Sequence, residues 1–273
     1  MVVFPCCKIN LGLHILNKRS DGFHNIETVL YPLPFTDVLE IIPDIGLPEG
    51  DVAFDSEGLK VGGRAVDNLV MRAHQVLHQD HALPGLRVFL YKNVPFGAGL
   101  GGGSSDAAFA LKLMRDMFLP QLSDDELKLY AGKLGSDCPF FIEGRPAFAH
   151  GRGELLESFP LDLKGLFIVL IKPEPNVSTA EAYTEVTPCE PGQRIREILT
   201  MPVDTWKMHL TNDFEASVFK KYPVISEVKN ELYRQGALYA SMSGSGSCVY
   251  GLFRKAPDLP QQLNHQAVLK AWL

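Results

Sequence analysis

The first forty residues carry the alternating apolar spacing that is typical of β-strands. Between residues 8 and 15 every second position is apolar. Because successive side chains of a strand point to opposite faces, Lys8 and Asn10 are expected to share one face. A polar turn follows, and the apolar stretches at residues 26–30 and 38–42 predict two more strands. The chain is therefore predicted to begin with β-structure.

Helical spacing and one further strand follow in the next fifty residues. Apolar side chains at positions 69, 73, 76 and 77 fall on one face of a helix. Asp67 precedes them and can cap the helix, because its carboxylate can accept from the amides of the first turn. Residues 86–94 are rich in valine, phenylalanine, leucine and tyrosine and predict a strand.

Two more helices are predicted before residue 136. Apolar residues recur at helical spacing from position 107 to position 117, and Ser104 or Ser105 can cap this helix. Ser123 and Glu126 fit the capping-box pattern at the start of the next helix. That helix is predicted to end at Gly135, where a glycine can adopt the left-handed conformation.

Pro-rich connections separate the apolar stretches in the C-terminal half of the chain. Residues 166–171 predict a strand. The β-like stretch 237–253 is interrupted by the serine–glycine sequence of residues 243–247. A final helix is predicted at residues 260–273, with its apolar side chains on one face.

The length of 273 residues suits two domains of ordinary size. The change of pattern near residue 150 predicts an N-terminal domain at residues 1–150 and a C-terminal domain at residues 151–273. With 46% hydrophobic residues, such a chain should bury about three quarters of the surface that it exposes when unfolded. The sequence is typical of a globular protein without internal repeats.

Charge and cysteine usage exclude several classes of protein. The 26 basic and 32 acidic residues give a net charge of −6, which lacks the positive field of a nucleic-acid-binding protein. The five cysteines are odd in number and form no C-x-x-C pair, which argues against a disulfide framework and a thiolate zinc site. We find no apolar run near the roughly 20 residues of a membrane span and no secretory leader, so we expect a cytoplasmic protein.

A glycine-dense loop after residue 94 is the most informative feature of the sequence. Five of the seven residues 97–103 are glycine. Each glycine costs roughly 0.5–1 kcal/mol more to order than alanine, so this density needs a compensating reason. A loop of bare amides that leads into the N-terminus of a helix suits a polyphosphate. The simpler alternative is a tight turn from strand to helix, although an ordinary turn needs only one or two glycines.

The loop does not fit three common nucleotide-binding motifs. A Walker loop requires Lys and then Ser or Thr after Gly102, where this chain has Gly103 and Ser104. Residues 97–102 do satisfy G-x-G-x-x-G, but the acidic residue that a dinucleotide fold needs about 20 positions later falls at Asp116, inside a helical pattern. The dinucleotide fold remains the weaker alternative. The V-A-I-K and H-R-D motifs of protein kinases do not occur in the sequence.

Residues 95–108 resemble the phosphate loop of the GHMP kinases, a superfamily of small-molecule kinases. Residues 243–247 resemble the third motif of this superfamily. Further segments resemble the group of GHMP kinases that phosphorylates the 2-hydroxyl of 4-diphosphocytidyl-2-C-methyl-D-erythritol in the non-mevalonate isoprenoid pathway; these segments are residues 8–11, 19–24, 135–141 and 177–183. The resemblance covers most of the chain but not residues 44–65, residues 188–209 and the last twenty or so positions.

The resemblance implies an α+β fold of two domains. The N-terminal domain would bind ATP and would be similar to ribosomal protein S5, and the C-terminal domain would be an α/β sandwich, with the active site in the cleft between them. It implies an ATP-dependent enzyme that uses Mg²⁺ and a small-molecule acceptor. No pattern in the sequence separates a monomer from a homodimer.

Asp137 and Lys8 are the candidate catalytic residues. From local sequence, Asp137 is either a turn residue or a functional carboxylate that can take the proton of the attacking hydroxyl. From sequence alone, Lys8 is more simply a surface lysine. Members of the family pair a lysine with an aspartate, and both motif positions are filled here. The resemblance therefore implies that Asp137 is the base and Lys8 is its electrostatic partner.

The resemblance also assigns the binding residues. Asn10 would orient the erythritol portion, and Phe23, His24 and Tyr183 would hold the cytidine by stacking and hydrogen bonds. The family commonly has tyrosine at the position of Phe23, which puts any hydrogen bond from that hydroxyl in doubt. Asn68 and Lys92 lie in segments that resemble the adenosine-contacting region. The implied phosphate contacts are Pro95, Gly97, Gly99, Gly101, Gly102, Gly103, Ser104 and Ser105; we assign no side chain to magnesium.

Alternatives remain open on the sequence alone. The acceptor could be homoserine, mevalonate or a sugar, and the chain could be a noncatalytic nucleotide-binding protein of the same fold. His74, His78 and His81 have a spacing that can bind a metal from one helix face, but exposed histidines on an amphipathic helix explain them better.

Overall fold

The computed structural model describes residues 1–60, 62 and 64–273, and these residues group into two compact units. The chain passes between the units several times, once inside the glycine-dense loop. The predicted domains at residues 1–150 and 151–273 are continuous segments, unlike these units, and stay a prediction. Unit 1 comprises Met1–Cys7, Phe35–Phe96 and Gly101–Arg145, and unit 2 comprises Lys8–Pro34, Gly97–Leu100 and Pro146–Leu273.

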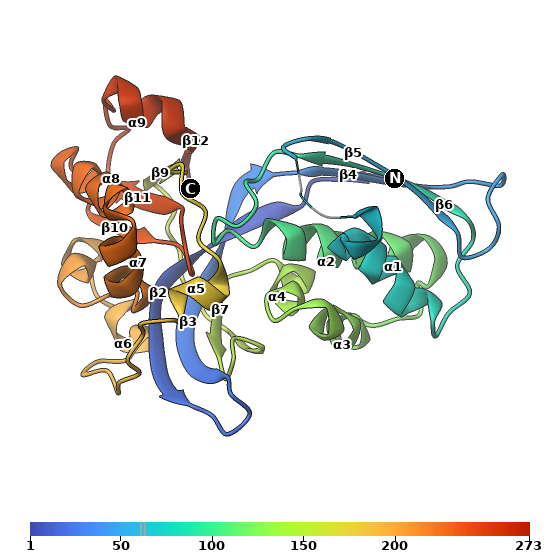
Figure 1. Cartoon of the computed structure of the whole chain (residues 1–273), viewed down its shortest axis with the longest axis horizontal. Helices are drawn as coiled ribbons and strands as arrows, with labels where there is room; N and C mark the ends of the chain where they lie inside the picture. Colours follow the sequence, from blue (N-terminus) through green and yellow to red (C-terminus); the bar gives the residue numbers. More distant parts are fainter. Residues whose placement is uncertain (61, 63) are drawn as a thin grey trace. The chain divides into compact units, whose positions relative to one another are not determined.

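A mixed sheet with helices on one side makes up unit 1 (Figure 1). Its strands lie in the order β1-β4-β6-β5, with β6 antiparallel to β4 and parallel to β5. The predicted strands at residues 38–42 and 86–94 are confirmed as β4 and β6. The elements of unit 1 are β1 (Val2–Val3), β4 (Val38–Pro43), β5 (Val52–Gly58), β6 (Leu86–Lys92), the short 3-10 helix Ala65–Asp67, α1 (Leu69–His78), α2 (Gly102–Phe118), α3 (Asp124–Leu134) and α4 (Cys138–Glu143).

Caps of two helices differ from the sequence prediction by one to four residues. Asn68, and not Asp67, caps α1, because its side chain accepts from the backbone N–H of Val70 at 2.9 Å. Helix α2 begins at Gly102, ahead of the predicted serine caps, and its cap is Gly101 in the left-handed conformation (φ 68°). A glycine can make this sharp entry without a side-chain cap.

The capping box of α3 is confirmed. The hydroxyl of Ser123 accepts from the backbone N–H of Glu126, whose carboxylate accepts in return from the backbone N–H of Ser123. The helix also ends at Gly135, as predicted. The conformation of Gly135 is extended (φ 171°) rather than left-handed, so the expected C-terminal turn is wrong.

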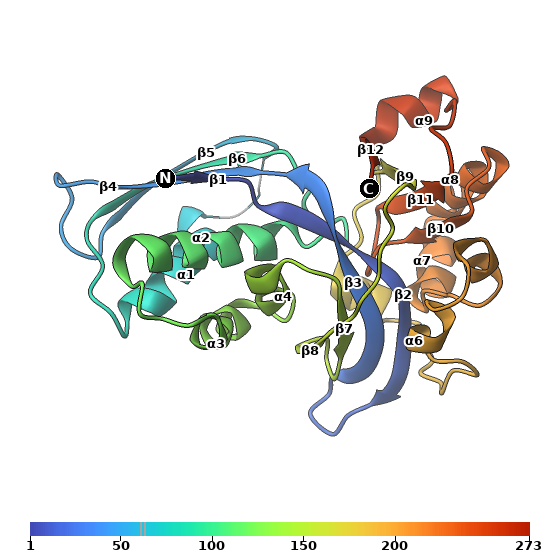
Figure 2. The same cartoon turned by 180° about the vertical axis from the view of Figure 1, so that it is seen from behind.

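Unit 2 contains two sheets and a group of short helices (Figure 2). One sheet has the order β2-β3-β7-β8 and the other β10-β11-β9-β12. The elements are β2 (Cys6–Lys18), β3 (His24–Thr36), β7 (Ala147–His150), β8 (Leu155–Ser158), β9 (Phe167–Ile171), β10 (Tyr239–Met242), β11 (Val249–Phe253), β12 (Ala267–Trp272), α5 (Thr179–Ala182), α6 (Ile195–Ile198), the 3-10 helix Val203–Met208, α7 (Phe214–Lys221), α8 (Pro223–Arg234) and α9 (Gln261–Gln266). Strands β2 and β3 each have one end in unit 1.

The core of unit 2 joins its sheets to helices α7 and α8. Residues of β2, β9 and β11 pack with the apolar faces of both helices, and burying each such side chain contributes about 1.5–3 kcal/mol. The strongly buried members include Leu13, Ile15, Val169, Ile171, Phe214, Val218, Ile225, Leu232 and Val249.

The predicted C-terminal helix is wrong over its second half. Helix α9 covers only Gln261–Gln266, and residues 267–272 form β12, which pairs with β9 in antiparallel register. The aromatic ring of Trp272 packs edge-on against Phe167 at 5.2 Å. The apolar residues that suggested a helix face are used to extend the sheet, because β9 offers an edge for hydrogen bonding. None of the helices in the described part of the chain has the length and apolar character needed to cross a bilayer.

Candidate active site

Left-handed backbone at three positions explains part of the glycine density in the loop. Gly97, Gly99 and Gly101 have φ values of 63°, 74° and 68°. Other residues rarely adopt this conformation, since a side chain there costs about 1–2 kcal/mol. The loop therefore needs glycine at every second position from 97 to 101.

Gly102 and Gly103 form the first turn of α2. A Cβ atom on Gly102 would lie 3.0 Å from Val94 Cγ1 and 3.3 Å from the Lys92 ammonium nitrogen. The backbone here rests directly on the end of β6. The first amides of an α-helix have no acceptor within the helix, and the 17-residue α2 brings a positive dipole end to this point. This part of unit 1 can hold an anion.

The two serines of the loop occupy different environments. Ser105 is fully buried, and its backbone N–H donates to the Gly101 carbonyl at 2.9 Å. Ser104 is half-buried and is in hydrogen-bond contact with the thiol of Cys138, whose pKa is raised to about 11 by burial. A phosphate contact fits the position of Ser104 better than that of Ser105, and both contacts stay predictions.

Asp137 is half-buried and lies at the start of α4 in unit 1. Among the described residues its side chain makes no capping hydrogen bond to that helix. Its neighbour Cys138 contacts Ser104, and a Cβ atom on Gly135 would lie 4.0 Å from the Ser104 hydroxyl. The segment that carries Asp137 therefore packs beside the N-terminus of α2.

Lys8 and Asn10 point the same way from β2, as the alternating pattern predicts. The Lys8 ammonium donates to the Asn10 side-chain oxygen at 2.6 Å and to the Gly99 carbonyl at 3.0 Å. The amide nitrogen of Asn10 donates to the hydroxyl of Thr28 at 3.1 Å. Lys8 is only 3% exposed, so the interpretation as a surface lysine is wrong. Unit 2 thus holds a cationic group in a fixed position beside the loop residues 97–100.

The serine–glycine sequence of residues 243–247 supports this arrangement, a role that sequence analysis did not assign. The hydroxyl of Ser243 donates to the Gly99 carbonyl at 2.8 Å and accepts from the Asn10 backbone N–H at 3.2 Å. The side chain of Asn212 donates to the Gly244 carbonyl at 2.8 Å. Residues 97–100 and residues 243–247 are therefore joined by the hydrogen bond from Ser243 to Gly99.

The predicted cytidine-binding residues fall into two places in unit 2. His24 and Tyr183 stack with ring centres 4.9 Å apart and planes 14° apart, and Phe214 packs edge-on against Tyr183 at 4.8 Å. Phe23 is 55% exposed, and the guanidinium of Arg152 lies 5.0 Å from the centre of its ring. The spacing of the His24–Tyr183 pair excludes a base between these two rings, so a base would stack on an outer face.

Lys92 and Asn68, the predicted adenosine contacts, have structural partners. Asn68 caps α1, and Lys92 is buried and donates to the carboxylates of Asp37 and Asp106. The sequence alone does not identify either aspartate as a partner of Lys92, because nothing in the spacing of residues 37, 92 and 106 shows that they meet. Contact of Asn68 and Lys92 with adenosine stays a prediction.

Several predicted pairings join residues of different units. Lys8, Asn10 and the cytidine-binding residues belong to unit 2, whereas Asp137 and Ser104 belong to unit 1. The pairing of Lys8 with Asp137, and an active site in a cleft between the domains, stay predictions.

The three histidines near α1 do not form a metal site. His74 is buried and stacks on His78 with ring centres 5.5 Å apart, so the expectation that it is exposed is wrong. Burial and the neighbouring His78 lower the pKa of His74 to about 4. Across residues 1–60, 62 and 64–273, no group of three or more histidine, cysteine, aspartate or glutamate side chains is placed to hold a metal ion.

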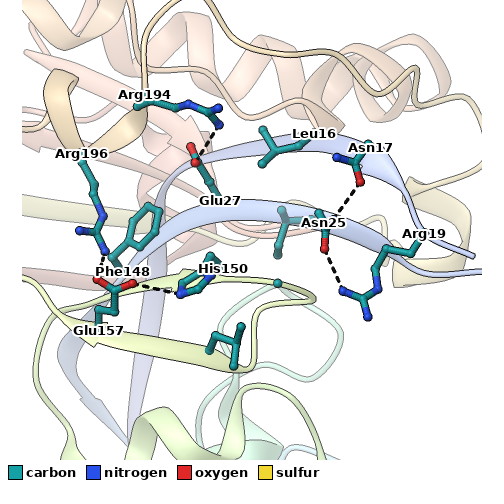
Figure 3. Close-up of a pocket in the computed structure, with 13 residues that line it drawn as sticks. Leu16, Asn17, Arg19, Asn25, Glu27, Phe148, His150, Glu157, Arg194 and Arg196 are labelled. Carbon is teal, nitrogen blue, oxygen red and sulfur yellow. Dashed lines mark hydrogen bonds and ion pairs between the residues drawn. The ribbon is translucent and has the colours of Figure 1, made fainter. Parts of the chain in front are cut away.

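A pocket of about 490 Å³ opens in unit 2 beside β2, β3 and β7 (Figure 3). Arg194 pairs with Glu27 at 2.9 Å, and Arg196 pairs with Glu157 while its guanidinium lies 3.9 Å from the centre of the Phe148 ring. None of the predicted site residues is among the described residues that line it. We assign no ligand to this pocket, because its guanidinium groups are matched by carboxylates.

Comparison with protein families and curated relatives identifies similar proteins. Residues 68–145 match the GHMP kinases N terminal domain, and residues 204–267 match the GHMP kinases C terminal domain. The chain is 51% identical to a 4-diphosphocytidyl-2-C-methyl-D-erythritol kinase of Bacteroides thetaiotaomicron over 96% of this chain and 95% of the relative. It is 39% identical to the protein of the same name from Chlorobium limicola, over 94% of this chain and 89% of the relative.

Solved structures show the same fold. A crystal structure of 4-(cytidine 5'-diphospho)-2C-methyl-D-erythritol kinase matches with a TM-score of 0.77 and 31% identity, over 92% of this chain and 90% of that chain. A mevalonate kinase structure matches with a TM-score of 0.64 and 14% identity, over 93% of this chain and 91% of that chain, which shows the fold alone. The expected α+β fold of the GHMP kinases is confirmed.

Proposed function

The chain belongs to the 4-diphosphocytidyl-2-C-methyl-D-erythritol kinase family of GHMP kinases, and from this membership we propose that it phosphorylates the 2-hydroxyl of 4-diphosphocytidyl-2-C-methyl-D-erythritol with ATP. The proposed substrate rests on the 51% identity, over 96% of the chain, to a relative named 4-diphosphocytidyl-2-C-methyl-D-erythritol kinase. The reaction is a step of the non-mevalonate route to isoprenoid precursors.

ATP would be held through its phosphates by the glycine-dense loop. The first-turn amides of α2 provide donors that have no acceptor within the helix, and Ser104 adds a half-buried hydroxyl beside them. Gly102 and Gly103 leave the backbone bare, so phosphate oxygens can approach the N–H groups closely. Pro95, Gly97, Gly99 and Gly101 would shape the loop.

The transfer step moves one proton and one phosphoryl group. Asp137 would accept the proton of the acceptor hydroxyl as its oxygen bonds to the γ-phosphorus, while the bond from that phosphorus to the bridging oxygen breaks and ADP leaves. The Lys8 ammonium would stabilise the negative charge that develops on the attacking oxygen. Its bonds to Asn10 and Gly99 support this role, because they fix the position of the ammonium group.

Magnesium is expected to accompany ATP. The described residues offer no acidic cluster for a dedicated metal cage, so phosphate oxygens and water would supply most of its ligands. When bound, the ion would neutralise charge on the transferred phosphate. We assign none of the side chains of this chain to it.

A coupled assay of ADP release tests the proposal. With 4-diphosphocytidyl-2-C-methyl-D-erythritol, ATP and magnesium, the purified protein should turn over at an ordinary kinase rate of about 1–100 s⁻¹. Mevalonate, homoserine and galactose should give no turnover above background. Turnover with one of these instead would favour another GHMP kinase, and ATP binding without any turnover would favour a noncatalytic nucleotide-binding protein.

Replacing Tyr183 by leucine should weaken binding of the cytidine acceptor. Stacking of a base on an aromatic ring contributes about 1–3 kcal/mol, so KM for the acceptor should rise by roughly 5- to 100-fold. KM for ATP is the internal control and should change by less than about twofold, since Tyr183 contacts only His24 and Phe214 among the described rings. Equal changes in both values, measured in the same assay, would contradict a role in acceptor binding.

We also propose a cytoplasmic location for the protein, as a monomer or a homodimer. The odd number of cysteines and the lack of a C-x-x-C pair argue against a disulfide framework, which supports a reducing compartment. Light scattering after size-exclusion chromatography distinguishes the two oligomeric states.

A further inference from the structure

A buried group of three charges lies beneath the phosphate loop in unit 1. Lys92 ends β6 and is 3% exposed, and its ammonium donates to Asp106 at 2.7 Å and to Asp37. Asp106 belongs to the N-terminal part of α2 and is 2% exposed, and Asp37 is fully buried just before β4. These charges are excluded from solvent, which makes their balance energetically important.

The three charges are connected directly to the backbone of the loop. The second carboxylate oxygen of Asp37 accepts from the backbone N–H groups of Asn93 at 2.6 Å and Val94 at 2.8 Å. Gly102 sits above Lys92, and a Cβ atom there would lie 3.3 Å from the ammonium nitrogen. The backbone of Gly102, in the first turn of α2, therefore lies against the Lys92 ammonium group and the Val94 side chain.

The group carries one negative charge in excess when both carboxylates are ionised. Asp37 has hydrogen-bond partners for both oxygens, whereas Asp106 Oδ1 has none among the described residues. Burial, opposed by Lys92 and reinforced by Asp37, raises the pKa of Asp106 to about 7. The charged groups that face Asp106 are Lys92 from β6 and Asp37 from the segment before β4.

We propose that Asp106 is a positioning residue whose negative charge, held beneath the loop by Lys92, weakens ATP binding. ATP binding is then coupled to the uptake of a proton by Asp106. The proposal rests on the proposed function, in which the first-turn amides of α2 bind the ATP phosphates. A carboxylate behind these amides repels the phosphates, and a neutral carboxyl does not. By linkage, bound phosphate must favour the protonated form of Asp106 to the same extent.

The variant Asp106→Asn tests the sign of the effect. Asparagine keeps the shape of the side chain and an oxygen that can accept from Lys92, but it removes the charge. At pH 8.5 the variant should bind ATP about 3- to 10-fold more tightly than the unsubstituted protein, as expected for one charge in a partly screened site. At pH 6, below the raised pKa of Asp106, the two affinities should approach each other, because the carboxyl is then mostly neutral.

The ratio of the two affinities at each pH cancels the titration of ATP itself. Asp116→Asn is the matched control, since Asp116 lies on the same helix with 48% of its side chain exposed and pairs with Arg115. Its ATP affinity should equal that of the unsubstituted protein at both pH values. If Asp106 has a purely structural role, Asp106→Asn should bind ATP more weakly than the unsubstituted protein at every pH. That result would overturn the proposal, and so would equal ATP affinities of the two proteins at pH 8.5.

Calorimetry provides a second measurement, which detects the proton uptake directly. ATP binding at pH 7.5 in two buffers of different ionisation enthalpy should reveal net uptake of a fraction of a proton, and Asp106→Asn should lose this uptake. Absence of uptake would overturn the inference while leaving the proposed function intact. Failure of the unsubstituted protein to bind ATP at all would overturn both.

Discussion

Replacing Asp137 by asparagine is expected to lower kcat by about 10²- to 10⁴-fold, the range typical of removing a general base. Asparagine has nearly the same shape but cannot take the proton of the acceptor hydroxyl. The segment that carries Asp137 packs beside Ser104 at the N-terminus of α2, so the side chain starts close to the proposed phosphate site. The measurement is steady-state ADP release with saturating substrates.

The control for this prediction is Asp125→Asn. Asp125 lies in the first turn of α3 with 91% of its side chain exposed. The kcat of the Asp125→Asn variant should therefore remain within about twofold of the value for the unsubstituted protein. KM for ATP should change little in Asp137→Asn, because the proton acceptor acts in the transition state. A kcat within tenfold of the unsubstituted value would show that another group takes the proton.

Replacing Gly99 by alanine should destabilise unit 2 more than the same replacement at Gly97. The new Cβ atom would lie 1.9 Å from the Ser243 carbonyl oxygen, and Gly99 has a left-handed φ of 74°. The conformational strain and the forced movement of backbone together predict a loss of about 2–4 kcal/mol in the free energy of unfolding. Urea unfolding followed by circular dichroism measures the loss.

Gly97→Ala is the matched control for strain alone. Gly97 is also left-handed (φ 63°), but a Cβ atom there would meet no atom of the described residues within 4 Å. It should cost only about 1 kcal/mol, the usual penalty for alanine in this conformation. Equal losses in Gly97→Ala and Gly99→Ala would show that the contact between Gly99 and Ser243 does not constrain the loop.

The sequence predictions that are confirmed depend on single residues or on residues close together in the chain. The Ser123–Glu126 capping box joins groups three residues apart, so the sequence contains both partners. The shared direction of Lys8 and Asn10 follows from the pleat of a single strand. The glycine-dense loop was informative for the same reason, because left-handed φ values constrain each residue by itself.

Contacts between distant parts of the chain explain where sequence analysis failed. Apolar residues 267–272 fit a helix face, yet β9 provides an edge on which they form a strand. His74 was expected to be exposed, but it is buried in the packed interior of unit 1. Neither the strand at residues 267–272 nor the burial of His74 is determined by the immediately neighbouring residues in the sequence.

The order of residues alone was sufficient to identify the glycine-dense loop and the family, since these follow from short motifs and from backbone preferences of single residues. Folding was needed to bring Asp37, Lys92 and Asp106 into one buried cluster and to join Ser243 to Gly99, positions 144 residues apart. Such partners are chosen by burial and by the demand that each buried polar group find a hydrogen bond, and both demands are met only when the whole chain has packed.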